Sequence, residues 1–126
     1  DLDHLKQIND QYGHAAGDWA LRQTVDVCRN FMRNNDVFGR IGGEEFAILL
    51  PGCQSDKAHL LAEICRDAIS NIDTAASGYD FKLSASFGVT SAELSGYHLT
   101  KLIEDADTAM YQAKQQGRNK VQFFQG

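Results

Sequence analysis

The residues with the most evident chemistry lie at a glycine-rich bend, Gly42-Gly43-Glu44-Glu45-Phe46. Two runs of strand-forming residues flank the glycines. This pattern is typical of a β-hairpin with a two-residue Gly-Gly turn, because glycine adopts a positive φ without a Cβ penalty. The two carboxylates follow directly, where the backbone is exposed and bent. Oxygen ligands at such a bend suit a hard cation such as Mg²⁺ held beside a phosphate-bearing ligand.

A second acidic segment opens the chain. Asp1 and Asp3 are two residues apart, so on a strand they point to the same face. Glu44 and Glu45 are adjacent, so they point to opposite faces and should not do equal work. If the first residues pair beside the hairpin, Asp1 and one glutamate converge on a shared ion. The alternative is that all four acids are solvated residues of turns and strand ends.

Four segments, in a fixed order, extend this pattern through most of the chain. They are Asp1-Leu2-Asp3-His4-Leu5-Lys6; Asn9-Asp10-x-Tyr12-Gly13-His14-x-x-Gly17-Asp18; Arg40-Ile41-Gly42-Gly43-Glu44-Glu45-Phe46; and Asp107-x-Ala109-Met110-Tyr111-x-Ala113-Lys114-x-x-Gly117-Arg118-Asn119. Together they resemble the catalytic domain of the diguanylate cyclases, the family named for its Gly-Gly-Asp/Glu-Glu-Phe hairpin. The resemblance runs from the first residue to about Phe124, with leucine at position 5 where the family more often has phenylalanine.

The resemblance implies the condensation of two GTP molecules into cyclic di-GMP, with release of two pyrophosphates. It assigns Mg²⁺ or Mn²⁺ to the Asp1 side chain, the Leu2 carbonyl and Glu44, with Glu45 as a further ligand. Glu44 is also the family's proposed general base, although a metal-bound carboxylate is a poor base. Lys6 is the family's transition-state cation, which would counter charge that builds at the phosphate.

The resemblance also implies a set of substrate contacts. They are His4, Leu5, Lys6, Asn9, His14, Asp18, Gly43, Lys114 and Arg118. Guanine presents two adjacent donors that one carboxylate accepts together, so Asp18 and the amide of Asn9 fit a guanine pocket. Asp18 after a glycine also fits a helix N-cap. Lys114 and Arg118 match the family's triphosphate-binding pair. Their position is also explained without a ligand, because the helix macrodipole favours cations at a helix C-terminus.

A regulatory motif precedes the hairpin. Arg33 lies nine residues before Gly42, and Asp36 follows it by three. Many family members carry Arg-x-x-Asp at this spacing as an inhibitory site for the product, because arginine forks onto the Hoogsteen edge of guanine and aspartate accepts from its Watson–Crick edge. A helix-ending arginine beside a turn aspartate explains the same pattern without a ligand.

Composition limits the class of protein. The 126 residues suffice for one domain, and the net charge of −5 argues against a nucleic-acid-binding surface. Cys28, Cys53 and Cys65 lack metal-binding spacing and are predicted to be reduced. No apolar run approaches the roughly 20 residues of a membrane span, so we expect a cytoplasmic domain without membrane contact of its own. The parent protein can still be anchored in the inner membrane through other segments.

Hydrophobic periodicity predicts the order helix, hairpin, helix, strand, helix, strand. The predicted ranges are 18–33, 37–41 with 45–50, 55–72, 81–89, 102–117 and 121–124. Residues 1–126 are therefore expected to form a single α/β (α+β) domain with helices around a mixed, partly antiparallel sheet. The resemblance implies a five-stranded, palm-like sheet. Because Asp1 opens inside a motif, we expect most of the first, central strand and a preceding helix to be missing.

One guanine pocket and one acidic pair per chain imply a homodimer, because two bonds must form between two nucleotides. The resemblance further implies an N-terminal sensor domain upstream and weak or no activity of this chain alone. Two rival functions remain. One is a catalytically silent module that binds GTP or cyclic di-GMP, although silent relatives usually lose an acid that persists here. The other is a cyclase of single nucleotides, which Asn9, Asp18 and the hairpin disfavour.

Overall fold

The computed structural model describes residues 1–125. Its elements, in chain order, are α1 (Leu5–Tyr12), α2 (His14–Arg29), β1 (Val37–Arg40), β2 (Phe46–Leu49), α3 (Ser55–Ser70), the short 3₁₀ turn η1 (Ala75–Ser77), β3 (Phe87–Val89), α4 (Ala92–Ser95), α5 (Leu99–Gln115) and β4 (Val121–Phe123). No helix among these residues is both long enough and apolar enough to cross a membrane.

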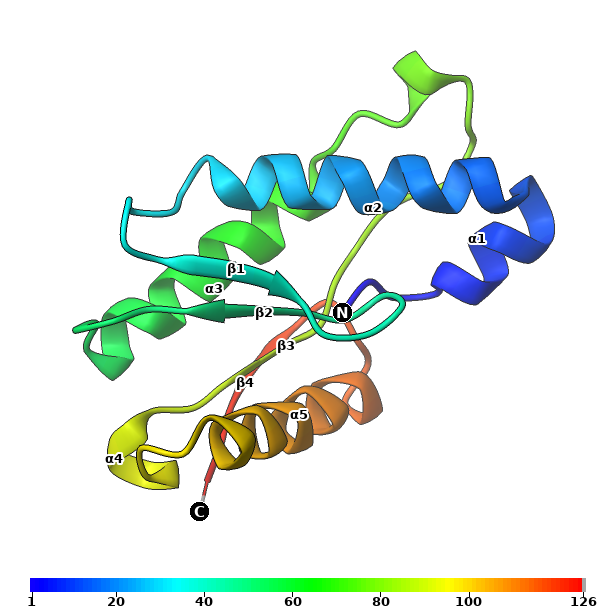
Figure 1. Cartoon of the computed structure of the whole chain (residues 1–126). Coiled ribbons are helices and arrows are strands. Elements are labelled where there is room, and N and C mark those ends of the chain that lie inside the picture. Colours follow the sequence, from blue (N-terminus) through cyan, green and yellow to red (C-terminus); the bar gives the residue numbers. More distant parts are fainter. Residues whose placement is uncertain (126) are drawn as a thin grey trace.

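The strands form a middle layer between helices. β1 and β2 pair antiparallel, and β3 pairs parallel with β4. The helices α2 and α3 lie on one side of the strands and α5 lies on the other (Figure 1). Leu2 and Ala85 join the core beneath α2 and α3, together with Cys65 and Ile69. On the opposite side α5 packs closely against β3, since a Cβ added to Gly88 would lie 1.9 Å from the Ala106 carbonyl oxygen.

The mixed α/β architecture predicted from the sequence is confirmed, but the continuous five-stranded sheet is not observed. Residues 1–125 form two separate two-stranded sheets and one isolated antiparallel bridge between Leu2 and Ala85. The expected strand over 81–89 is regular only at β3. The second hairpin strand, whose two apolar faces predicted a central position, pairs with β1 along one edge alone.

The observed helix boundaries differ most from the predicted ones near the amino end of the chain. α2 begins at His14, four residues before the predicted start, and ends at Arg29. The helix α1 was not predicted at all. Gly13 separates the two helices with a φ of 91°, a conformation that glycine adopts without strain. Ser55 is the first residue of α3, and the N-cap residue Gln54 makes no side-chain capping bond.

The three cysteines are free thiols, as predicted. Cys28 of α2 and Cys65 of α3 are buried where the two helices meet. The neighbouring Cys65 thiol and burial raise the pKa of Cys28, so this group stays a neutral thiol. Both side chains serve as small apolar residues of the core.

Candidate active site

Asp1 and Leu2 present oxygen atoms at one end of the strand layer. The backbone N–H and carbonyl of Asp1 bond to Ser86, each at 3.0 Å, which fixes the first residue against the strand before β3. The Asp1 side chain is only 7% exposed, and its Oδ1 atom is buried without a hydrogen-bond partner. An unpartnered buried carboxylate oxygen is costly unless something positive binds it.

Asp3 plays a different part from Asp1. The Asp3 carboxylate accepts bonds from the Ser84 and Ser86 hydroxyls at 2.7 Å each, and from the Asn119 N–H at 3.0 Å. The Lys114 ammonium lies 3.2 Å away. Burial opposes ionisation, but these bonds and the lysine charge outweigh it and hold the pKa of Asp3 below its usual value. Asp3 therefore ties the first residues to the loop after α5.

Lys114 and Arg118, the predicted triphosphate-binding pair, lie in different surroundings. Lys114, in the last turn of α5, points inward to Asp3, with the Leu2 carbonyl at 3.5 Å and Asp1 Oδ2 at 3.7 Å. Arg118 is exposed and adopts a φ of 65° in the loop that follows α5. The ammonium of Lys114 thus lies beside the same oxygens that the sequence assigned to a divalent cation.

The hairpin bend differs from the predicted tight turn. The Ile41 N–H bonds to the Glu45 carbonyl at 2.9 Å, so three residues form the bend rather than two. Neither Gly42 nor Gly43 has a positive φ, so the predicted reason for the glycines is wrong. A Cβ on Gly43 would meet no atom within 4 Å. The missing side chain leaves the outer surface of the bend open to a ligand.

Arg40 holds the bend in shape. Its Nε donates to the carbonyls of Gly42 and Gly43 at 3.2 and 3.1 Å, and its guanidinium lies 5.9 Å from the centre of the Phe46 ring. Five donors in a rigid fork suit arginine to this stapling. The sequence singled out Arg40 within the motif without assigning it this role.

The two glutamates face different surroundings, as their adjacency predicted. Glu45 lines the same cavity as Asp1, whereas Glu44 is not among the residues that line it. Glu45 is therefore the hairpin acid that shares a cavity with the first residue.

The donor set suits a hard divalent cation. Asp1 Oδ1 supplies an unpartnered carboxylate oxygen, and the Leu2 carbonyl and Asp1 Oδ2 lie 3.5 and 3.7 Å from the same Lys114 ammonium. Within residues 1–125 no three or more His, Cys, Asp or Glu side chains gather into a metal site. Mg²⁺ commonly takes one or two carboxylates and completes its shell with phosphate and water. A site of this kind would need a phosphate ligand to be complete.

The corner between α1 and α2 brings Asn9 and Gly17 together. A Cβ on Gly17 would lie 1.8 Å from Asn9 Oδ1, so only glycine admits the asparagine side chain in this position. Asn9 Oδ1 is buried without a partner. Asp18 is exposed inside α2, and the N-cap of that helix is Gly13, so the capping explanation for Asp18 is wrong. His14 is exposed at the first position of α2.

The amino end of α1 offers backbone donors. His4 has a φ of 61° and makes no side-chain cap, and the first helical bond runs from the Ile8 N–H to the His4 carbonyl. The N–H groups of the first turn, which begins at Leu5, therefore lack acceptors within the helix. Lys6 is exposed beside them. This arrangement can bind an anion such as a phosphate.

Arg33 and Asp36 bind each other. The Asp36 carboxylate accepts from the Arg33 backbone N–H at 2.8 Å, from Nε at 3.0 Å and from the terminal guanidinium nitrogen at 2.7 Å. The guanidinium also donates to the Pro51 carbonyl at 2.9 Å. Hydrogen bonds from Arg33 hold the pKa of Asp36 below its usual value. The side chain of Asp36 is 1% exposed and that of Arg33 is 49% exposed, so an incoming ligand meets the arginine first.

Comparisons with known proteins agree with the motif pattern. The family model described as "Diguanylate cyclase, GGDEF domain" matches residues 1–120. Diguanylate cyclase A of Treponema denticola is 36% identical over 121 residues, which are 96% of this chain and 33% of that protein. The uncharacterised protein YhcK of Bacillus subtilis is 40% identical over 124 residues, 98% of this chain and 34% of YhcK. The chain thus spans about a third of the length of these curated relatives.

Solved structures show the same fold. The structure described as the active GGEEF domain of a diguanylate cyclase from Vibrio cholerae matches this chain with a TM-score of 0.87 and 30% identity. The match covers 100% of this chain and 80% of that one. The GGDEF domain of DgcB from Caulobacter crescentus, solved in complex with c-di-GMP, has a TM-score of 0.87 and 29% identity. That match covers 100% of this chain and 75% of the DgcB chain.

Proposed function

The chain belongs to the diguanylate cyclase GGDEF family, and from this premise we propose that it condenses two GTP molecules into cyclic di-GMP with release of two pyrophosphates. The observation that carries the proposal is the buried, unpartnered oxygen of Asp1 at the cavity that Glu45 also lines. The relatives named diguanylate cyclases and the DgcB domain in complex with c-di-GMP support the choice of substrate and product.

Each step would be an attack of a ribose 3′-hydroxyl on the α-phosphate of the other nucleotide. Mg²⁺ or Mn²⁺ held by Asp1, the Leu2 carbonyl, Glu44 and Glu45 would acidify the attacking hydroxyl and neutralise charge on the leaving pyrophosphate. Glu44 is the proposed proton acceptor. The exposed Lys6 is proposed to counter charge at the reacting phosphate.

Triphosphate binding is assigned to the amino end of α1 and to the residues around the carboxyl end of α5. The N–H groups at the start of α1, next to His4 and Leu5, would bind phosphate oxygens. Gly43, which has no side chain, would let the phosphates approach the bend. Arg118 is exposed, and we assign it to the triphosphate as well. Lys114 would have to turn from Asp3 toward the phosphates, so we propose that nucleotide binding draws it out of its present ion pairs.

The guanine base is assigned to Asn9, Asp18 and His14 at the corner of α1 and α2. One such corner per chain accommodates one GTP, so two chains must face each other to close the ring. We propose that two chains form the active homodimer and that an upstream sensor domain governs how they come together.

The test is separation of the products formed from radiolabelled GTP and, in parallel, ATP. The protein should carry its natural preceding residues. Cyclic di-GMP from GTP and nothing from ATP is expected. No product at any protein concentration, with retained nucleotide binding, would favour a silent signalling module, and a cyclic mononucleotide would favour the single-nucleotide cyclase.

Replacing Gly17 by alanine is expected to weaken GTP binding about tenfold or more. The added Cβ would collide with Asn9 Oδ1 and displace the amide from the base pocket. One well-placed polar contact to a base discriminates by about 1–3 kcal/mol. Calorimetric titration with GTP measures the loss. Asn9→Ala should match it, and the double variant should lose no more than either single variant because both act through one side chain.

Replacing Arg33 by alanine is expected to raise the concentration of cyclic di-GMP needed for inhibition about tenfold or more, with turnover at low product unchanged. We propose that the guanidinium, half exposed above Asp36, forks onto the product guanine. Initial rates at increasing added cyclic di-GMP give the inhibition constant. Lys57→Ala is a matched change of an exposed cation on α3. An inhibition constant equal in all three proteins would refute the assignment.

A further inference from the structure

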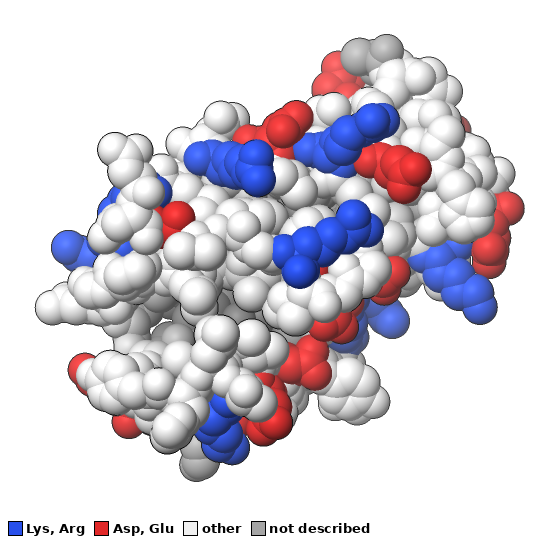
Figure 2. Space-filling model, in the orientation of Figure 1, with Lys and Arg blue, Asp and Glu red and all other residues white. Residues whose placement is uncertain are grey.

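The cations of this domain are dispersed over its surface. The net charge of the chain is −5, and on the face that Figure 2 shows, Lys and Arg side chains are interspersed with Asp and Glu side chains. A triphosphate is a polyanion, so the cations that bind it here have to be placed individually. Arg118 is exposed in the loop after α5, and the backbone of this loop decides where its guanidinium begins.

The backbone turns left-handed in this loop. Gly117, Arg118 and Asn119 have φ angles of 118°, 65° and 50°. This conformation is unfavourable for an arginine, whereas asparagine tolerates it better. The Arg118 N–H bonds to the Ala113 carbonyl at 3.1 Å, a bond of the kind that ends helices. Arg118 is thus tied to α5 on its upstream side, and the residue that follows it has to hold the other side.

Asn119 bonds to two distant parts of the chain. Its N–H donates to Asp3 Oδ2 at 3.0 Å, and its Oδ1 accepts from the Arg66 guanidinium at 3.1 Å and the Ser70 hydroxyl at 3.2 Å. The Ser70 hydroxyl has one hydrogen and also lies 3.0 Å from the Arg66 carbonyl, so Arg66 is the main donor. Glu63 accepts from Arg66 Nε at 3.2 Å and keeps the guanidinium in place.

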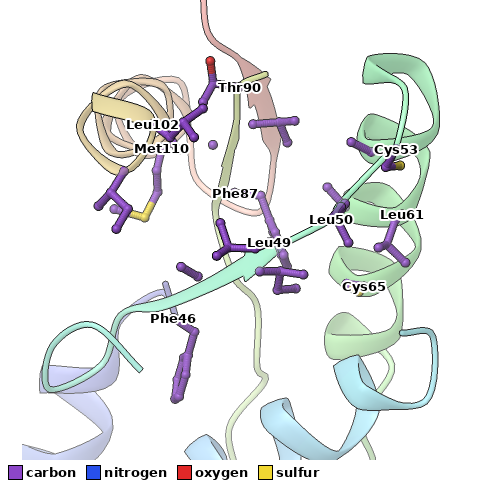
Figure 3. A pocket seen from close by; sticks show the side chains of 18 of the residues that line it. Phe46, Leu49, Leu50, Cys53, Leu61, Cys65, Phe87, Thr90, Leu102 and Met110 are labelled. Atoms are coloured by element: carbon purple, nitrogen blue, oxygen red, sulfur yellow. The ribbon is translucent and has the colours of Figure 1, made fainter. Parts of the chain in front are cut away.

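These bonds join elements that are otherwise apart. In the close view, α3 and α5 lie on opposite sides of a cavity of about 800 Å³, marked by Leu61 and Cys65 on α3 and by Met110 on α5 (Figure 3). Asn119 follows α5 in the chain, contacts α3 through its side chain and contacts Asp3 through its N–H. One residue therefore connects the loop after α5, the helix α3 and the first residues of the chain.

We propose that Asn119 is a positioning residue for GTP, which holds Arg118 at a fixed place relative to Asp1 so that the guanidinium binds the triphosphate. The inference rests on the proposed function. Asp3 is two residues from Asp1, the proposed metal ligand, so the bond from Asn119 to Asp3 sets the separation between the metal-binding oxygens and the phosphate-binding cation. A backbone fixed before GTP arrives reduces the ordering that binding requires.

Two variants remove the contact with α3 from opposite sides, in the longer protein that carries the natural residues before Asp1. Arg66→Met removes the donor, keeps an apolar stem of similar length and leaves residues 117–119 unchanged. Asn119→Gly removes the acceptor but keeps the left-handed backbone and the N–H to Asp3. Each is expected to weaken GTP binding about tenfold, since hydrogen bonds to charged groups have this size. Calorimetric titration at fixed Mg²⁺ measures the loss.

The comparison with Arg118→Ala separates positioning from a general loss of structure. Arg118→Ala should lose as much GTP affinity as Asn119→Gly, and the double variant should lose no more than either, because both act through one guanidinium. The affinity for GMP, which lacks the β- and γ-phosphates, should stay within about twofold. Asn71→Gly, at the exposed carboxyl end of α3, is the matched control and should bind GTP normally. Additive losses, or an equal loss for GMP, would overturn the proposal.

Backbone ¹⁵N relaxation tests the same inference without any nucleotide. The order parameter of the Arg118 amide is expected to fall from about 0.85 to below about 0.6 in Arg66→Met. An unchanged order parameter would overturn the proposal, whether or not the protein makes cyclic di-GMP. If Arg66→Met does not fold, Asn119→Gly takes its place in this measurement. Failure of the proposed function would appear separately, as an original protein that binds no GTP or forms no product.

Discussion

Replacing Glu44 by glutamine is expected to lower cyclic di-GMP synthesis roughly 100-fold or more while most GTP binding remains. A positioned general base commonly contributes about 100-fold or more to the rate. Glutamine keeps the shape of the side chain but loses both the negative charge and the ability to accept a proton. The base pocket that we propose at Asn9 and Asp18 is separate from the hairpin, so binding of the nucleotide should survive.

The neighbouring acid makes this experiment sharper. Glu45, and not Glu44, lines the cavity with Asp1, so the two positions can be ranked by comparing Glu44→Gln with Glu45→Gln. Glu104→Gln, an exposed change on α5, controls for net charge. Turnover of labelled GTP at saturating Mg²⁺ is the measurement. Normal turnover in Glu44→Gln with a dead Glu45→Gln would transfer the catalytic assignment from the first glutamate to the second.

The sequence predicted the three long helices α2, α3 and α5 and the hairpin because their signals are local, whereas it missed the short helices α1 and α4. Periodic apolar residues located α2, α3 and α5, and the glycine-rich motif located the bend between β1 and β2. The roles of individual residues depend on distant partners and were harder to predict. Asp3 looked like a second copy of Asp1, yet it accepts hydrogen bonds from Ser84 and Ser86, which lie 81 and 83 residues later in the chain.

Other errors have equally specific causes. Asp18 follows a glycine, which suggested a helix cap, but Gly13 with its positive φ already starts α2. Lys114 and Arg118 have the spacing of helical neighbours, but the helix ends between them and the buried Asp3 attracts only the lysine. The alternating serines at 84 and 86 opposite an Asp-x-Asp segment were the signal that could have identified Asp3 as a structural residue.

The second large effect concerns Asp3 itself. Asp3→Asn is expected to lower the free energy of unfolding by about 3–5 kcal/mol, the typical loss when one partner of a buried ion pair is removed. The amide keeps one acceptor oxygen, but its NH₂ group would face donors from Ser84 or Asn119, and the Lys114 ammonium would lose its nearest carboxylate. Urea unfolding of the longer protein measures the change. Asp26→Asn, an exposed aspartate on α2, should stay within about 0.5 kcal/mol of the original protein.

The pH dependence of stability separates the charge of Asp3 from its shape. Because the folded state lowers the pKa of Asp3 below its ordinary value of 3.8, the stabilisation is complete above about pH 4 and is lost as pH falls through the folded value. The difference in unfolding free energy between the original protein and Asp3→Asn should therefore shrink in that acid range. Lys114→Met should be much less damaging in the Asp3→Asn background than alone, because the two side chains form one contact. Additive losses and a pH-independent difference would mean that Asp3 acts by packing alone.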